Sequence, residues 1–599
     1  MVKDDNFELA KLFFNKGIEE FKKKNYLLAE EFYNKSLKEL PDRVSSITNL
    51  SAAQLKLGKY NEALINSKKS VEIDENNLDG WLNYGSAYLF LNKYNEALDC
   101  FLKILKIDNS KIEVILNLAL TYEKLKKYNL AIEQALRAKE INKYFEFVFG
   151  YYIKLKLKIC NWDSIDEEIN EFNTLLKEKK IISSPLISLT TSDDPLTHAM
   201  CSEKYIEKSF PNIIRNDFNT VDVSKRKINI GYFSSDFRKH AVSFLVRDLF
   251  LYHDKTKFNL VGYNLNKNLD DNITFEIKKN FDQFLNISTL NDEEAVKLIK
   301  AHQLDIAVDL NGYTENARTN LFINKIAPIQ VNFLGYPGSM HLDCYDYIIT
   351  DKIIINERSK NVFKESLVIM PDSYQINSRR NNLAKNDIKR IDYNLPDDQT
   401  IFCCFNRSHK ILPSIFNSWM NILKKVEKSV LWLFYDNQIA STNLIDQAKK
   451  RGVNHNRIIF AEECEFEDHL ERQKLADIFL DTFPYNAHTT CIDAIWAGLP
   501  VITLQGNSFS SRVASSILNS LNLNELITSS LYEYELKAIE LANDNEKLLK
   551  VKKAINEKKI NSNLFKTDIY TKYLENAYEE MIFNHNKMKS KKDILINEI

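Results

Sequence analysis

Residues 481–511 read DTFPYNAHTTCIDAIWAGLPVITLQGNSFSS, and this stretch decides the fold of the second half of the chain. An apolar run at 478–480 leads into a polar turn, and a helix is expected to begin at His488. A second apolar run, 501–504, follows a Gly-Leu-Pro turn. Strand, helix and strand in this order indicate the nucleotide-binding half of a doubly wound α/β domain.

The start of this helix is a candidate phosphate site. His488, Thr489 and Thr490 would place unpaired N–H groups and hydroxyls at the positive end of the helix dipole, where an anion is stabilised. Asp493, one turn further on, is placed to accept hydrogen bonds from a sugar hydroxyl. The alternative is a routine threonine cap, with Asp493 only complementing the dipole.

The first part of the chain repeats every 34 residues. The repeat has three columns, which are Tyr26, Tyr60, Tyr94 and Tyr128; Ala29, Ala63, Ala97 and Ala131; and Gly17, Ser51, Gly85 and Ala119. Period and residue types match the tetratricopeptide repeat (TPR), a helix–turn–helix unit in which small residues let helices approach closely. We expect a TPR α-solenoid over residues 8–179, with a degenerate fifth unit carrying Trp162 and Ile165 in the Tyr and Ala columns.

A solenoid presents a concave face, which favours docking of protein or peptide partners. The alternatives are a spacer or a homodimerisation arm. Residues 180–224 break the helical pattern with Ser, Asp and Pro and are predicted to be a joint with one helix around 196–208.

Composition narrows the class of protein. The 599 residues are 44% hydrophobic and 27% charged with a net charge of −1, which gives no overall field for nucleic acid or an acidic membrane. The eight cysteines contain no Cys-x-x-Cys pair, and no apolar run approaches the ~18 residues of a membrane span. We therefore expect a reduced, cytoplasmic protein without a metal site.

Alternating strands and helices continue on both sides of residue 390. Strands are expected at 228–233, 259–263, 305–310 and 329–334, and again at 400–405, 430–434 and 457–460. Two doubly wound halves, residues 225–385 and 395–585, describe a two-lobed GT-B (double Rossmann-like) region. The last helix, 565–584, is expected to cross back to the first half.

Seven sequence blocks in this order resemble the O-linked N-acetylglucosamine transferase family, including its SPINDLY-like members. The blocks are GYFSSDFRKHAVSFL (231–245), DLNGYTENAR (309–318), APIQVNFLGYPGS (327–339), DYIITD (346–351), FNRSHKILPS (405–414), LADIFLDTFPYNAHTTCIDAIWAGLPVIT (475–503) and SRVASSIL (511–518). The resemblance implies an inverting glycosyltransferase without a metal or other cofactor. Its co-substrate would be a nucleotide sugar, UDP-N-acetylglucosamine first, and its acceptors Ser/Thr hydroxyls of proteins.

The resemblance also implies roles for individual residues. Lys410 would hold the diphosphate, whose negative charge grows as the sugar–phosphate bond breaks. His240 would lie near the reacting sugar, as a base or a positioning group. The remaining residues expected to bind the nucleotide sugar are Arg407, His469, Arg472, His488, Thr489, Thr490, Asp493, Gly335, Tyr336 and Gly338.

Some positions depart from the family pattern around base and donor recognition. Arg407, Phe466, Asp305 and Cys491 replace the residue types that animal members carry there. The alternatives that remain open are a GDP-fucose or UDP-glucose donor, an acceptor other than Ser/Thr, and a catalytically silent TPR scaffold that binds nucleotide.

Overall fold

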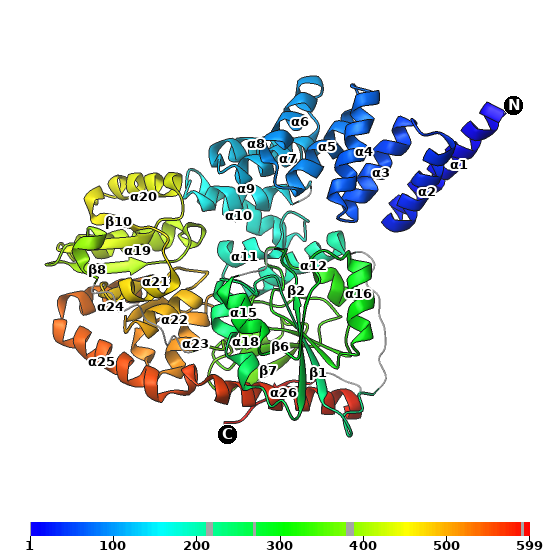
Figure 1. Cartoon of the computed structure of the whole chain (residues 1–599). Coiled ribbons are helices and arrows are strands. Elements are labelled where there is room, and N and C mark those ends of the chain that lie inside the picture. Colours follow the sequence, from blue (N-terminus) through cyan, green and yellow to red (C-terminus); the bar gives the residue numbers. More distant parts are fainter. Residues whose placement is uncertain are drawn as a thin grey trace. The chain divides into compact units, whose positions relative to one another are not determined.

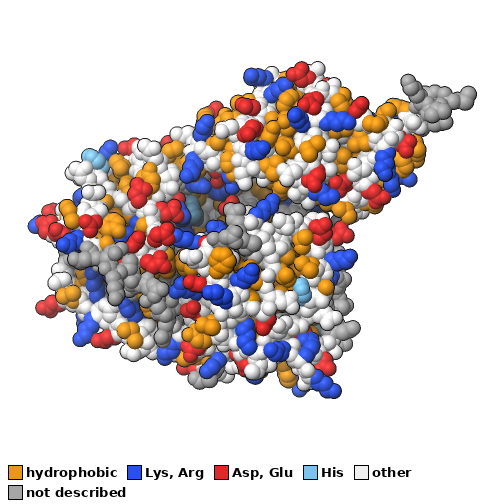
Figure 2. Space-filling view, in the orientation of Figure 1, with side chains coloured by type: hydrophobic (Ala, Val, Ile, Leu, Met, Phe, Trp, Pro, Cys, Tyr) orange, Lys and Arg blue, Asp and Glu red, His pale blue; other side chains and the backbone are white. Residues whose placement is uncertain are grey.

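The computed structural model describes residues 2–145, 147–210, 220–267, 271–378, 388–588 and 592–598. The contacts between residues divide the chain into two compact units, Met1–Leu155 and Lys156–Ile599, which are taken separately (Figure 1). None of the described helices is both long and apolar enough to cross a membrane. Acidic and basic side chains are interspersed over the face shown in Figure 2, in keeping with the net charge of −1.

The first unit is an array of antiparallel helix pairs. Its helices are α1 (Val2–Lys22), α2 (Tyr26–Glu39), α3 (Val44–Lys56), α4 (Tyr60–Ile73), α5 (Leu78–Phe90), α6 (Tyr94–Ile107), α7 (Ile112–Lys124), α8 (Tyr128–Asn142) and the start of α9 (Val148–Lys158). The four repeated tyrosines are the first residues of α2, α4, α6 and α8. The expected TPR array is therefore confirmed.

Close helix packing explains two of the repeated columns. A Cβ on Gly17 would lie 2.5 Å from the Tyr33 ring, and one on Gly85 would lie 2.6 Å from the Phe101 ring. The repeated alanines, such as Ala29 and Ala97, are fully buried. Small residues are needed at these positions because a side chain of the neighbouring helix packs directly against the backbone.

The second unit begins ahead of the joint. This unit contains α10 (Ile165–Lys177), which lies in the predicted array, and the joint helices α11 (Pro185–Thr191) and α12 (Pro195–Ser209). Helix α10 begins at Ile165, and Trp162 packs edge-on against Phe416 with ring centroids 5.1 Å apart. The boundary between the units falls inside the predicted 8–179 array, and Lys158, Cys160 and Trp162 of that range contact lobe 2. Residues 211–219 of the predicted joint lie outside the described residues.

Lobe 1 is a doubly wound parallel sheet. Its strands are β1 (Ile228–Ser234), β2 (Phe258–Asn264), β3 (Gln283–Asn286), β4 (Ile306–Asp309), β5 (Ile329–Asn332), β6 (Tyr347–Asp351), β7 (Ser366–Met370) and β14 (Ile594–Leu595). Among the described residues the order is β14-β7-β6-β5-β4-β1-β2-β3, so the direction of winding reverses between β1 and β4. The helices are α13 (Ala241–Val246), α14 (Leu249–Tyr252), α15 (Asn272–Lys278), α16 (Asp292–Ala301), α17 (Thr319–Ile323) and α18 (Glu357–Lys360).

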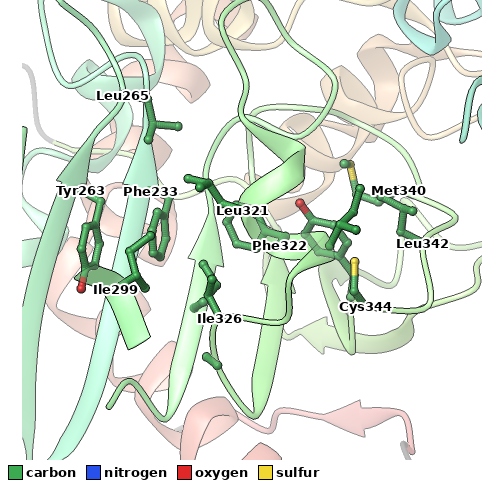
Figure 3. Close-up of a cluster of buried hydrophobic side chains, with 14 of the residues drawn as sticks. Phe233, Tyr263, Leu265, Ile299, Leu321, Phe322, Ile326, Met340, Leu342 and Cys344 are labelled. Carbon is green, nitrogen blue, oxygen red and sulfur yellow. The ribbon is translucent and has the colours of Figure 1, made fainter. Parts of the chain in front are cut away.

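A hydrophobic cluster fixes the polar loops at one end of this sheet. Phe233 of β1 stacks on Tyr263 of β2 with ring centroids 4.4 Å apart, and Phe322 of α17 packs on the same cluster (Figure 3). Met340 and Cys344 belong to the loop that follows β5, and both pack in the same cluster. The loops at the carboxyl ends of the strands therefore rest on a packed base.

Lobe 2 repeats the same winding. Its strands are β8 (Thr400–Cys404), β9 (Ser429–Phe434), β10 (Ile458–Ala461), β11 (Ile478–Leu480), β12 (Val501–Leu504) and β13 (Ile527–Thr528). All pairs are parallel in the order β10-β9-β8-β11-β12-β13, with the reversal between β8 and β11. The α-helices are α19 (Pro413–Lys425), α20 (Gln438–Lys450), α21 (Phe466–Gln473), α22 (Thr489–Trp496), α23 (Val513–Ser520), α24 (Leu531–Asn543) and α25 (Asn545–Asn561). Single 3-10 turns complete the second unit at η1 (Arg390–Tyr393), η2 (Ser408–Lys410), η3 (His455–Arg457), η4 (Asn524–Leu526) and η5 (Asn563–Phe565).

The chain then returns to lobe 1 through α26 (Thr567–Met588), drawn in red in Figure 1. The Tyr578 hydroxyl lies 3.0 Å from that of Tyr232 on β1, and Glu575 accepts a 2.9 Å hydrogen bond from His253. Strand β14 then pairs with β7. The expected crossing of the last helix is confirmed.

The strand expectations agree with the structure within two residues at each end. Strands β3, β6, β7, β13 and β14 were not among them. Strand β3 lies at an edge of the sheet and has polar, exposed ends, and β13 and β14 are two residues each, so none of the three gives an apolar run long enough to be recognised. Residue 385, the predicted end of lobe 1, lies outside the described residues.

Candidate functional site

Lobe 2 gathers the predicted phosphate-site residues at its winding reversal. Lys410 ends η2, which follows β8, and His488 precedes α22, which follows β11. Strands β8 and β11 are neighbours and parallel, so their carboxyl ends open onto the same edge of the sheet. This is the position at which open α/β sheets hold ligands.

Lys410 is half-buried and held by the turn before α22. Its Nζ donates to the Asn486 carbonyl at 2.9 Å and lies 3.8 Å from the centre of the Tyr485 ring. Burial lowers the pKa of Lys410 to about 8, and the nearby Asp481 carboxylate opposes that shift. The ammonium is therefore poorly solvated and oriented, as a group that stabilises charge on a ligand should be.

Asp481 organises the turn itself. Its carboxylate accepts hydrogen bonds from Thr482 N–H at 2.7 Å, Ala487 N–H at 2.6 Å and the Thr503 hydroxyl at 2.7 Å. Burial raises the pKa of Asp481, while these donors and Lys410 act in the opposite direction. Asp481 thereby fixes both the backbone that holds Lys410 and the residue before His488.

The residues expected to form the anion site lie at the start of α22. His488 is the residue before the helix, and its Nε2–H donates to the Ser510 carbonyl at 3.2 Å. Burial lowers the pKa of His488 well below its usual range, with Lys410 acting in the same direction. The Thr490 hydroxyl donates to Asn406 Oδ1 at 2.5 Å, which ties α22 to the end of β8.

Asp493 is 5% exposed and lies on the buried side of α22. Its predicted role toward a ribose remains a prediction. Thr489 is partly exposed at the first helical position.

His469 and Arg472 form one unit on α21. Arg472 Nε–H donates to His469 Nδ1 at 3.1 Å, and the guanidinium also donates to the Glu462 carbonyl. Both side chains pack on Phe405 at the end of β8, with ring or guanidinium centres 5.2 and 5.3 Å away. Arg472 is 2% exposed and therefore fixed in place. Because its Nε–H donates to Nδ1 of His469, that ring is oriented and carries its own proton on Nε2. Burial lowers the pKa of His469 to about 3.

Arg407 lies on the outer side of the same strand end. Its guanidinium pairs with Asp436 at 3.0 Å and covers the Phe434 ring, and the side chain is about half exposed. Asp436 also accepts from the Ser408 N–H and hydroxyl, at 3.1 and 2.6 Å. Arg407 is therefore held at the rim rather than buried beside Lys410.

In lobe 1, His240 follows the carboxyl end of β1. It caps α13, where Val242 N–H donates to His240 Nδ1 at 3.3 Å. Burial lowers the pKa of His240, opposed by Asp236, whose carboxylate is 3.6 Å away. The neutral ring that accepts at Nδ1 carries its proton on Nε2, so in this geometry it presents a donor.

Asn311 holds the turn that contains Asp236. Its amide donates to Asp236 Oδ2 at 3.0 Å and to the Ser235 hydroxyl at 2.9 Å, and it accepts from Ser235 N–H at 2.7 Å. These contacts join the loops after β1 and β4, which flank the winding reversal of lobe 1.

The glycine loop after β5 is packed against the loop after β4. A Cβ on Gly335 would lie 2.1 Å from the Leu310 carbonyl oxygen. Tyr336 is 2% exposed, and the Gly338 carbonyl accepts from Asn332 Nδ2 at 2.9 Å. The structure thus supplies an internal reason for the glycine at 335, while direct contact with a sugar remains a prediction.

The two lobes touch beside His240. Lys239 pairs with Glu465, and Phe244 stacks on Phe466 with ring centroids 4.0 Å apart. A pocket of about 270 Å³ lies between these contacts and is also lined by Arg247. The same helix, α21, carries His469. The charge of Arg407 in lobe 2 also acts on His240 and lowers the pKa of its ring, so these two predicted site residues lie near each other.

Several residues of this network were not predicted. Asp481, Tyr485 and Asn486 lie inside the quoted 481–511 stretch, but their partners are set by the fold. Asn406, Asp236 and Asn311 lie inside the quoted blocks at strand ends, and a polar residue directly after a buried strand is the signal that would have found them.

Comparisons with known families agree with this architecture. A family model described as glycosyl transferase family 41 matches residues 198–390 and 387–574. A tetratricopeptide repeat model matches residues 44–77, 78–111 and 112–145.

Curated relatives are similar over more than half of this chain. The probable UDP-N-acetylglucosamine–peptide N-acetylglucosaminyltransferase SEC of Arabidopsis thaliana is 31% identical over 448 residues, which cover 71% of this chain and 45% of the relative. The probable enzyme of the same description, SPINDLY, from Hordeum vulgare is 29% identical over 370 residues, covering 60% of this chain and 38% of the relative. The chain thus spans less than half the length of these relatives.

A solved structure aligns with nearly all of the chain. A mutant of the O-GlcNAc transferase from Thermobaculum terrenum aligns with a TM-score of 0.62 at 20% identity, covering 98% of this chain and 99% of that chain. The likeness confirms the fold expected from the sequence, a helical repeat array followed by two parallel-sheet lobes.

Proposed function

Because the chain belongs to glycosyl transferase family 41, we propose that it transfers a sugar from a nucleoside diphosphate sugar to hydroxyl groups of protein side chains. The observation that carries the proposal is the position of Lys410 next to the start of α22. A half-buried ammonium and a helix N-terminus converge there from neighbouring strand ends. Both favour an anion, and a departing diphosphate is the anion such a transfer releases.

The donor we propose is UDP-N-acetylglucosamine. The two relatives described above carry that donor in their names, and the phosphate-site residues Lys410, His488, Thr489 and Thr490 are all present. His469 would meet the nucleotide base, because its ring is oriented by Arg472 and retains one free donor. No separate cofactor is part of the proposal.

The reaction we propose is a single displacement with inversion. A Ser or Thr hydroxyl oxygen bonds to the anomeric carbon as the bond from that carbon to the diphosphate oxygen breaks. Lys410 and the α22 N–H groups stabilise the charge on the leaving diphosphate. His240, with its proton on Nε2, orients the hydroxyl or the sugar by donating a hydrogen bond, and the hydroxyl proton passes to the diphosphate.

The repeat array supports a polypeptide acceptor. TPR arrays are interaction modules, and an extended chain fits a solenoid surface. We propose that this unit binds acceptor proteins.

The test is release of nucleotide from UDP-N-acetylglucosamine, UDP-glucose and GDP-fucose, with a protein lysate as acceptor. Wild type, Lys410→Ala and Lys449→Ala are compared; Lys449 is a surface lysine paired with Asp446 and serves as the matched control. We expect release from the UDP-N-acetylglucosamine sample, at least a hundredfold slower in Lys410→Ala and unchanged in Lys449→Ala. Equal rates in Lys410→Ala and wild type would contradict the role of Lys410. Nucleotide binding without release from any donor would favour a silent scaffold.

A further inference from the structure

The loop after β12 surrounds a carboxylate that comes from the joint. Asp193, between α11 and α12, accepts from Asn507 N–H at 2.8 Å, Asn507 Nδ2 at 3.0 Å, Ser508 N–H at 3.1 Å and the Ser511 hydroxyl at 2.5 Å. A Cβ on Gly506 would lie 2.3 Å from Asp193 Oδ1. The carboxylate thus fills the loop as a bound anion fills a nest of backbone amides.

Asp193 is held firmly from its own side. The carbonyl of Ser192 accepts from His198 Nε2 at 2.8 Å, and the carbonyl of Thr191 accepts from Asn173 Nδ2 at 2.9 Å. Burial lowers the pKa of His198, which favours the neutral ring, and that ring carries its proton on the Nε2 that donates to the carbonyl. Asp194 is engaged elsewhere, because it caps α12 through Leu196 N–H and the Thr197 hydroxyl.

The same loop supports the phosphate site. The Ser510 carbonyl accepts from Asn486 N–H at 3.1 Å and from His488 Nε2 at 3.2 Å. The Asn486 carbonyl in turn accepts from Lys410 Nζ at 2.9 Å. The loop that Asp193 orders therefore positions the His488 ring before α22 and, through the backbone of Asn486, the Lys410 ammonium.

We propose that Asp193 is a positioning residue of the donor site: by filling the 506–511 loop, it fixes the Ser510 carbonyl and hence His488 and Lys410. This inference rests on the proposed function and extends it. The joint between the repeat array and the lobes then forms part of the donor site, although it contributes no group that touches the donor.

A carboxylate is required at this position. Four donor groups point at Asp193, and an ionised carboxylate accepts from all of them. In Asp193→Asn one oxygen becomes an NH2 group, which would face N–H donors. The loop then has to rearrange, although the side chain keeps its size.

The experiment measures the affinity of the full chain for UDP and for uridine. If the donor panel selects a guanine nucleotide, GDP and guanosine replace them. Asp193→Asn should weaken UDP binding at least tenfold and leave uridine binding within twofold, because Asp193 acts on the residues that hold phosphate. The matched control, Asp194→Asn, should leave both within twofold. A general loss of structure would weaken both ligands together, and melting curves check the fold of each variant.

A second variant, Ser511→Ala, tests the same inference if Asp193→Asn does not fold. Ser511→Ala removes one donor to Asp193 and should weaken UDP binding about threefold without changing uridine binding. UDP affinity equal to wild type in these variants, or equal losses for UDP and uridine, would overturn the inference alone. A wild-type chain that binds no nucleoside diphosphate would overturn the proposed function and, with it, this inference.

Discussion

The charge state of Lys410 should limit the reaction at alkaline pH. Burial lowers the pKa of this lysine to about 8, whereas a solvated lysine titrates near 10.5. Only the ammonium form stabilises a leaving diphosphate, so each pH unit above the pKa removes about nine-tenths of the competent enzyme. We expect kcat/KM to fall about tenfold between pH 8.5 and 9.5.

The pH at which the rate falls differs between the free and the loaded enzyme. A bound diphosphate favours the ammonium, so the pKa of Lys410 rises when donor binds. The alkaline fall should therefore appear in kcat/KM, which reports the free enzyme, and move to higher pH in kcat. A solvated lysine would leave both profiles flat to about pH 9.5.

The assay is nucleotide release at low and at saturating donor over pH 6.5–10, with UDP affinity measured in the same buffers. Lys410→Ala is the control, and its residual rate should show no alkaline fall. A wild-type kcat/KM that stays constant from pH 7.5 to 9.5 would refute the assignment of a poorly solvated, charge-stabilising lysine.

Two further changes test the packing beneath the site. Gly335→Ala places a Cβ 2.1 Å from the Leu310 carbonyl oxygen and should destabilise the chain by about 3 kcal/mol or more in urea titration. Gly452→Ala, at a positive φ but with the nearest atom, Lys424 Cε, 3.9 Å from the new Cβ, should cost about 1 kcal/mol. Similar losses in both variants would contradict the packing argument. Arg472→Met removes the donor that orients His469 and should raise donor KM at least tenfold with a smaller change in kcat, and an unchanged KM would show that His469 does not need Arg472.

Patterns of neighbouring residues, such as the 34-residue repeat and the apolar runs, were enough to predict most of the fold. The tyrosines at 34-residue spacing mark the first residue of four helices because each begins the same turn of the same unit. The 478–480 and 501–504 runs are β11 and β12 as expected, and His488 stands directly before α22. Periodicity and helix-start chemistry act within a few residues, so they are visible in sequence.

The partners of the site residues were not predictable in the same way. Asp193 lies 314 positions from Asn507, and nothing in its neighbourhood distinguishes it from Asp194, which merely caps a helix. Arg472 was expected to bind the nucleotide sugar, which remains a prediction; the structure shows it buried on α21 with its Nε–H donating to His469. Such assignments depend on which loops the sheets bring together, and a single sequence carries no signal for that.

The return of α26 and β14 to lobe 1 has a consequence for biosynthesis. Lobe 1 is built from two stretches of chain separated by the whole of lobe 2, so ribosomes complete its sheet only after residue 595 has been made. Until then the hydroxyl of Tyr232, the imidazole of His253 and the free edge of β7 lack the residues that cover them. Lobe 2 is contiguous from β8 to α25 and is free to fold first. The nascent chain can therefore complete its phosphate-site half before α26 and β14 complete the half that carries His240.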